Sequence, residues 1–170
     1  MFKNLFIQAV FFVVVFLLIS WFRESSLLPT DGEYALPEVT VERLSGQTVP
    51  LAQYSGKPTL YYFWAPWCSV CKLSMPNLQE FHESQMSKPE AERINVVSVA
   101  LSYDSKQEVI DYVVDRKYQF TTVLGNVETG AAFKIKGFPT YYFVDENGCL
   151  VSKSMGYSTE LGMFLRSLTL

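Results

Sequence analysis

The chain has 170 residues, of which 49% are hydrophobic and 18% are charged, enough for one domain with a substantial apolar core. Its 14 basic and 17 acidic residues give a net charge of -3 and leave no basic stripe, so nucleic acid is excluded as an expected partner. Three cysteines are too few for a disulfide scaffold, so each must be interpreted from its own spacing.

The N-terminal residues are the most apolar part of the chain. Segment 5–22, LFIQAVFFVVVFLLISWF, carries no charge and is long enough to cross a bilayer as a helix. Its C-terminal boundary, LLISWFRESS, offers bulky residues, unlike the small-residue cleavage site of a signal peptide, so we expect residues 1–22 to form a retained anchor that contacts lipid through 5–22. Trp21 and Phe22 suit the membrane interface, and Lys3 favours an N-terminus inside the cell.

A polar stretch separates this anchor from the rest of the chain. Residues 23–37 mix Ser, Pro, Gly and charges without an apolar period, which predicts a tether that holds the domain off the lipid surface. Residues 38–170 then form the expected domain. Two β-branched runs around LSGQ predict a hairpin within 39–51. The nearly unbroken apolar run 57–65 predicts a strand that is buried on both faces of a central sheet.

Helical and strand patterns alternate through the remaining residues. We expect a helix over 69–86 that Pro76 kinks, and a second helix that begins with Ser105 and Glu108 at the spacing of a capping box. The apolar face of this second helix comprises Val109, Ile110, Val113 and Val114.

Four more strands and two more helices complete the expected domain. The strands are predicted over 94–101, 121–124, 140–145 and 150–155, a short helix over 128–135, and a closing helix by Leu161, Phe164, Leu165 and Leu168 at helical spacing. The alternation favours the α/β class, with a central mixed sheet flanked by helices and an antiparallel hairpin near the end.

Cys68 and Cys71 form a CxxC pair between the end of a predicted buried strand and the start of a helix. At a helix N-terminus, unpaired N–H groups and the helix dipole favour the thiolate, so we expect Cys68 to be an exposed nucleophile with a lowered pKa. Cys71 follows one turn later, where it could resolve a mixed disulfide with a substrate. The pair therefore predicts thiol-disulfide exchange.

Metal binding is the alternative use of these thiols. A closed zinc site needs two further ligands, and the chain offers His82 and Cys149. His82 lies too far from Cys71 along the same predicted helix to share an ion with it. Copper(I) stays open, because thiolates and a methionine such as Met75 suit a soft metal. We expect no metal and no cofactor, and an ordinary surface position for His82. An intermolecular disulfide through Cys149 also stays open.

The stretch FWAPWCSVCKLSMP, followed much later by GFPTYYFVDENG, resembles the thioredoxin superfamily. Within it, the chain is similar to the membrane-anchored TlpA-like group, which includes ResA and CcmG proteins and thioredoxin-like proteins of copper-sensitivity operons. The resemblance covers about residues 38–169 and implies a thioredoxin-like fold. It also implies that Trp67 precedes the nucleophile and that a cis-proline, Pro139, faces the CxxC. Phe138 would then present backbone to an extended substrate.

The same resemblance implies a function and a location. The chain would be a single-pass protein of the bacterial inner membrane with its catalytic domain on the periplasmic or extracytoplasmic side. It would reduce cysteine pairs of exported proteins, and a membrane electron donor of the thiol-reducing type would recharge it. A disulfide oxidase or isomerase, and a copper(I) or haem-client binding module, stay open as alternatives.

Two residues depart from the pattern of the relatives. Tyr62 stands where thioredoxin has a buried aspartate, and Ser74 stands where some ResA-type proteins carry a glutamate. Both differences remove a carboxylate that could accept the proton of Cys71. The proton acceptor and the direction of electron flow therefore stay open.

Overall fold

The computed structural model describes residues 7–8, 10–12, 14–15, 18–19 and 24–170. Among these described residues, no helix is both long enough and apolar enough to cross a membrane. The predicted anchor over 5–22 lies partly outside the described residues, and Lys3, Trp21 and Phe22, which were expected to set its orientation and interface, lie wholly outside them.

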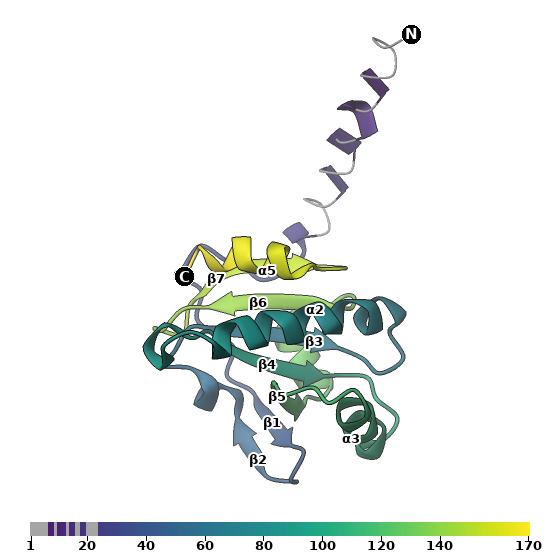
Figure 1. Cartoon of the computed structure of the whole chain (residues 1–170), viewed down its shortest axis with the longest axis vertical. Coiled ribbons are helices and arrows are strands. Elements are labelled where there is room, and N and C mark those ends of the chain that lie inside the picture. Colours follow the sequence, from purple (N-terminus) through teal and green to yellow (C-terminus); the bar gives the residue numbers. More distant parts are fainter. Residues whose placement is uncertain (1–6, 9, 13, 16–17, 20–23) are drawn as a thin grey trace.

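A mixed sheet organises the described part of the chain (Figure 1). Its strands are β1 Thr40–Arg43, β2 Thr48–Pro50, β3 Thr59–Trp64, β4 Asn95–Ala100, β5 Thr121–Leu124, β6 Thr140–Val144 and β7 Leu150–Met155. They lie in the order β2-β1-β5-β4-β3-β6-β7, in which β3, β4 and β5 are parallel and the other neighbours are antiparallel. The predicted α/β class, central mixed sheet and final hairpin are confirmed.

Helices flank this sheet close to the predicted places. They are α2 Ser69–Met86, α3 Lys106–Asp115, α4 Val127–Ala132 and α5 Glu160–Ser167, with 3-10 turns at Leu51–Tyr54 and Glu90–Glu92. The Ser105 hydroxyl accepts the backbone N–H of Glu108 at 3.2 Å, as the capping pattern predicts. The Glu108 carboxylate accepts the N–H of Asp104 instead of that of Ser105, so half of the predicted capping box forms.

Strand β3 divides the core into two clusters. Leu60, Tyr62 and Trp64 pack with buried residues of α2, α3 and α5 on one face of the sheet. Tyr61 and Phe63 pack on the other face, with residues around α4 and with the chain that precedes β1. Every residue of β3 is buried, which confirms the prediction of a strand covered on both faces.

The apolar side of α5 does not pack as its spacing suggested. The predicted stripe is largely exposed, and the exposed fractions of its side chains are 64% for Leu161, 44% for Phe164, 56% for Leu165 and 67% for Leu168. Met163 is the buried residue of this helix. Similarly, Val114 of α3 is 63% exposed. Helical spacing shows which side of a helix is apolar, whereas the neighbouring elements decide which side is covered.

The chain between residue 24 and β1 lies against the sheet. Leu27 and Leu28 are buried in the same cluster as Tyr61 and Phe63, and the backbone N–H of Leu28 donates to the Tyr142 hydroxyl at 3.2 Å. This packing differs from the free tether expected over 23–37. Two adjacent leucines bury enough apolar surface to hold a segment whose other residues have the composition of a linker.

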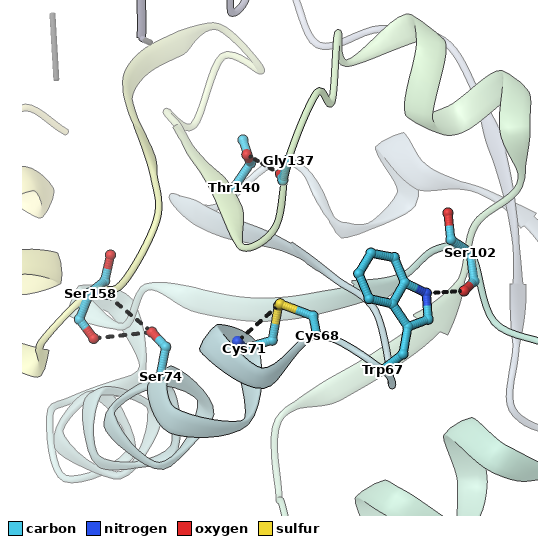
Figure 2. The surroundings of a disulfide bond; sticks show 8 residues. All are labelled: Trp67, Cys68, Cys71, Ser74, Ser102, Gly137, Thr140 and Ser158. Carbon is cyan, nitrogen blue, oxygen red and sulfur yellow. Dashed lines mark hydrogen bonds between the residues drawn. A yellow bond between two sulfur atoms is a disulfide. The ribbon is translucent and has the colours of Figure 1, made fainter. Parts of the chain in front are cut away.

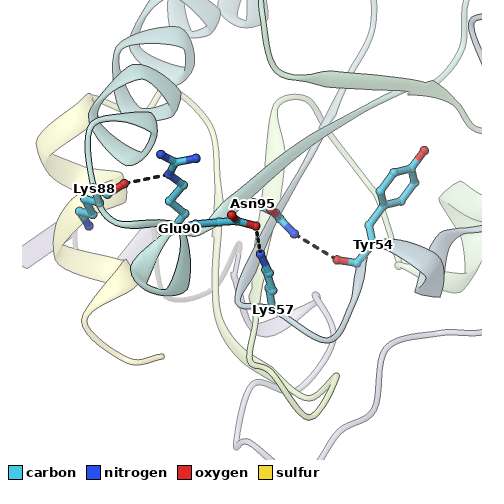
Figure 3. Close-up of polar contacts among 6 residues, drawn as sticks. Tyr54, Lys57, Lys88, Glu90 and Asn95 are labelled. Atoms are coloured by element: carbon cyan, nitrogen blue, oxygen red, sulfur yellow. Dashed lines mark hydrogen bonds and ion pairs between the residues drawn. The ribbon is translucent and has the colours of Figure 1, made fainter.

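Polar contacts fix the loops where β3 and β4 begin, at the ends of these strands far from the cysteines (Figure 3). The Lys57 ammonium lies 3.1 Å from a Glu90 carboxylate oxygen, and the side-chain amide of Asn95 donates to the Tyr54 carbonyl at 3.5 Å. The ion pair is exposed and contributes little stability. The two parallel strands therefore start in register and end together at the CxxC.

Candidate active site

Cys68 lies where the buried strand passes into the long helix. β3 ends at Trp64 and α2 begins at Ser69, with Cys68 as the residue that caps the helix. The Cys68 sulfur accepts the backbone N–H of Cys71 at 3.1 Å. The predicted strand, turn and helix arrangement is confirmed. In the reduced protein, the same N–H group and the helix dipole favour a thiolate at this sulfur.

The two cysteines form a disulfide in this structure, with their Cα atoms 5.2 Å apart. They differ in accessibility, because Cys68 is 6% exposed and Cys71 is completely buried. Cys68 is therefore less open than the sequence predicted, but it is the cysteine of the pair that another protein can reach. This order of burial is the one that an attacking and a resolving thiol require.

A loop before β6 faces the disulfide. Figure 2 shows the chain from Gly137 to Thr140 beside Cys68 and Cys71. The Phe138–Pro139 peptide bond is cis, as the resemblance implies. The Thr140 hydroxyl donates to the Gly137 carbonyl at 2.8 Å and closes the loop.

Trp67 is held on the surface beside the cysteines. Its side chain is 61% exposed, and its indole N–H donates to the Ser102 carbonyl at 2.7 Å (Figure 2). The Trp67 and Phe138 rings meet edge to face, with centroids 5.7 Å apart. An exposed ring and a half-buried ring from distant parts of the chain therefore form one aromatic surface next to the reactive pair.

A groove that sequence reasoning missed continues from this aromatic surface. Its volume is about 560 Å³, and Ser102, Tyr103, Ile135 and Phe138 are among its lining residues. Ser102 adopts a left-handed backbone conformation with φ of 51°, which places its carbonyl toward Trp67. No local pattern in the sequence predicts such a backbone at a serine, so the structure alone reveals the groove.

Neither Tyr62 nor Ser74 supplies a base to the cysteine pair. Burial raises the pKa of the Tyr62 phenol far above 10, and the nearby Ser74 hydroxyl opposes this shift only in part. The Tyr62 hydroxyl finds no hydrogen bond of acceptable geometry among the described residues. The Ser74 hydroxyl donates to the Ser158 carbonyl at 3.1 Å and accepts the Ser158 N–H at 3.2 Å, so it joins α2 to the segment before α5.

Among the described residues, the other candidate ligands do not gather with the cysteine pair into a group of His, Cys, Asp or Glu side chains that could hold a metal ion. His82 of α2 is half-buried with its ring edge-on to Phe120 at 6.3 Å, and burial lowers its pKa. Cys149 is half-buried opposite Ala35 in an isolated β-bridge, and its thiol takes no part in a disulfide among the described residues. Met75 is buried in the cluster that contains Cys68.

Comparison with known proteins places this geometry in a family. The AhpC/TSA family matches residues 33–153, which is well over half of the chain. The chain belongs to this family. Over 142 residues, this AhpC/TSA chain is 30% identical to thiol-disulfide oxidoreductase ResA of Oceanobacillus iheyensis, a match that covers 79% of this chain and 70% of the relative.

Further matches give this AhpC/TSA chain the same activity and fold. It is 25% identical over 150 residues to sporulation thiol-disulfide oxidoreductase A of Bacillus subtilis, covering 87% of this chain and 88% of that protein. The crystal structure of StoA from Bacillus subtilis superimposes with a TM-score of 0.64 at 26% identity, covering 80% and 99% of the two chains. The protein is a thiol-disulfide oxidoreductase with a thioredoxin-like fold, as the CxxC and cis-proline pattern predicts.

Proposed function

We propose that Cys68 is the attacking thiol, that Cys71 is the resolving thiol, and that the enzyme reduces disulfides of exported proteins. The observation that carries this assignment is the difference in burial, 6% exposure for Cys68 against none for Cys71. A substrate disulfide can approach the Cys68 sulfur, whereas the buried Cys71 sulfur can react only with the neighbouring Cys68 sulfur.

The reaction transfers two electrons from the enzyme to the substrate. The Cys68 thiolate attacks one sulfur of the substrate disulfide, forms a mixed disulfide and releases the other substrate sulfur as a thiolate. The Cys71 thiolate then attacks the Cys68 sulfur, which expels the second substrate thiolate and leaves the Cys68–Cys71 disulfide. The substrate has gained two electrons, and an electron donor of the thiol-reducing class must return two electrons to the enzyme before the next cycle.

Trp67, Phe138 and Pro139 bind the substrate in this proposal. The edge-to-face contact between the Trp67 and Phe138 rings supplies an apolar contact surface beside Cys68. The backbone next to Pro139 offers hydrogen-bonding groups to an extended chain, in the manner of strand addition. An extended segment with a cysteine in its middle fits this combination.

The enzyme is anchored in the bacterial inner membrane by residues 1–22 and works on the periplasmic or extracytoplasmic side. Support comes from the uncharged apolar segment 5–22, whose length matches a bilayer-spanning helix. This location supplies the clients, because disulfides form and persist outside the cytoplasm. It also places the enzyme beside a membrane electron donor.

A trapping experiment tests the assignment of the two thiols. The Cys71→Ser variant should accumulate mixed disulfides with client proteins through Cys68, because the resolving step is blocked. The matched Cys68→Ser variant should trap none. The absence of adducts in both variants, together with tight copper(I) binding by the reduced wild-type protein, would show that the thiols are metal ligands.

The equilibrium reduction potential of the pair tests the direction of electron flow. A value of about -270 mV, similar to that of thioredoxin, is expected of a reductase. A value of about -120 mV, similar to that of a strong periplasmic oxidant, would identify an oxidase instead. Glutathione buffers of known ratio, with acid quenching and thiol alkylation, give this potential directly.

A further inference from the structure

Helix α5 presents a continuous apolar surface to solvent. Its exposed side chains, here called the α5 apolar face, are Leu161, Phe164, Leu165 and Leu168. Their spacing of three and four residues puts them on one side of the helix. Single exposed apolar residues are ordinary on protein surfaces, whereas a contiguous set on one helix marks a contact with something apolar.

This face lies beside the point where the N-terminal segment reaches the domain. An Arg166 guanidinium nitrogen of α5 lies 3.4 Å from a Glu24 carboxylate oxygen. The Lys153 ammonium on β7 donates to the Leu28 carbonyl at 2.8 Å. Figure 1 shows the described N-terminal turns leaving the body on the side where α5 lies. Because the chain after Glu24 packs against the domain, α5 lies close to the end of the apolar segment.

We propose that the α5 apolar face rests on the lipid bilayer, in the interfacial layer beside the anchor. This inference depends on the proposed membrane anchor over residues 5–22. Glu24 lies two residue steps after position 22, a reach of at most about 7 Å. The headgroup layer on each side of the hydrocarbon core is about 5 to 7 Å thick. Glu24, and with it Arg166, therefore lies in or at the edge of that layer.

A short helix of this kind needs the anchor in order to bind lipid. α5 has eight residues, from Glu160 to Ser167, so its apolar face is small for an independent interfacial helix. The anchor tethers the domain to the membrane, which raises the effective concentration of lipid at the helix. Attraction to anionic headgroups does not drive the contact, because the chain after the anchor has 17 acidic residues and 13 basic residues, all of the 14 except Lys3. The contact is therefore apolar.

Seating α5 on lipid would orient the redox centre. Ser158 lies directly before the cap of α5, and its carbonyl accepts the Ser74 hydroxyl at 3.1 Å and the Asn77 side-chain amide at 2.8 Å, both from α2. These bonds connect the lipid-facing helix to the helix that carries Cys68 at its N-terminus. The disulfide then has one orientation relative to the bilayer, which suits an electron donor embedded in the same membrane.

Tryptophan quenching in vesicles tests the contact with the full chain. The protein is reconstituted into phosphatidylethanolamine and phosphatidylglycerol vesicles, with and without lipids brominated near the headgroup. The Leu165→Trp variant should fluoresce more than the parent chain, and the brominated lipids should quench most of this additional tryptophan emission. The matched Val114→Trp variant, which replaces a 63% exposed residue of α3, should lose none of its added emission. Adding Leu161→Asp and Leu168→Asp to Leu165→Trp should restore the lost emission.

Each other outcome overturns the inference in a recognisable way. If the chain floats with the vesicles and the Leu165→Trp emission is not quenched, the anchor holds and α5 does not touch lipid. If that emission is shifted to the blue without quenching, and the chain also cross-links to itself, a second copy of the chain covers α5. If the parent chain does not float with the vesicles, the proposed anchor fails and the inference fails with it.

Discussion

Tyr62 and Tyr142 lie on adjacent strands of the sheet, β3 and β6, and their side chains pack on opposite faces. On the face that α4 covers, the Tyr142 hydroxyl donates to the Phe133 carbonyl at 2.8 Å and accepts the Leu28 N–H at 3.2 Å. On the face that α2 covers, the Tyr62 hydroxyl is buried and has no hydrogen-bond partner among the described residues. The same side chain is thus fully paired on one face and unpaired on the other.

The contrast extends beyond this one pair. Among the described residues, the buried side-chain atoms without a hydrogen bond are the Tyr62 hydroxyl, the Trp64 indole nitrogen and the Tyr112 hydroxyl. All three residues belong to, or pack against, the cluster that contains Cys68 and Cys71. A buried unpaired polar group costs about 1 to 3 kcal/mol, so the redox face gives up stability that the opposite face retains. Costs of this kind are concentrated at functional sites.

The largest expected effect comes from the reactive cysteine on the face that α2 covers. Cys68→Ser should lower the rate of disulfide exchange by more than about a thousandfold, because it removes the nucleophile. Cys149→Ser should leave the rate unchanged, since this residue lies outside the redox cluster. Insulin reduction, followed by turbidity with a thiol as electron donor, measures both. A comparable loss in Cys149→Ser would mean that the third cysteine takes part in turnover.

The next effect concerns the paired face. Tyr142→Phe should lower the free energy of unfolding by about 1 to 3 kcal/mol, because the Phe133 carbonyl and the Leu28 N–H both lose a buried partner. Urea unfolding of the oxidised protein, followed by circular dichroism, gives this value. The exchange rate of the folded variant should not change. If the variant keeps its full stability, hydrogen bonding does not distinguish the two faces.

Alkaline pH acts on the same tyrosines. Burial raises the pKa of Tyr61 and of Tyr142 from 10 to about 12. In the unfolded chain these phenols ionise near pH 10, so above that pH the unfolded state binds fewer protons than the folded state. Their contribution to stability is intact below pH 10 and falls by about 1 kcal/mol per pH unit for each tyrosine as the pH rises toward 12.

Urea midpoints at pH 8, 10 and 11 measure this slope, with Tyr142→Phe as the matched variant. The slope of the variant should be smaller than that of the parent by the contribution of one tyrosine, about 1 kcal/mol per pH unit. Equal slopes in the two proteins would mean that the Tyr142 hydroxyl titrates normally and that its burial does not affect the proton balance.

The sequence predicts the reactive pair well and predicts its supports less well. An unbroken apolar run is sufficient to identify β3, and the spacing of Cys68 and Cys71 after it is sufficient to place the redox centre. The bond between Trp67 and the Ser102 carbonyl joins positions 35 apart through an unusual backbone angle, which no local pattern encodes. The exposure of Leu165 depends on which elements lie beside α5, and this is set only when the whole chain has folded.

The smallest effect tests the unpaired face directly. Tyr62→Phe removes a buried hydroxyl that has no partner among the described residues, so the free energy of unfolding should rise by about 1 kcal/mol. The rate of exchange between pH 6 and 9 should keep its value and its pH dependence, because a phenol whose pKa is raised by burial does not accept a proton in this range. A loss of stability as large as that of Tyr142→Phe would show that the Tyr62 hydroxyl is paired after all. A slower rate with a shifted pH profile would place this hydroxyl in the proton transfer from Cys71.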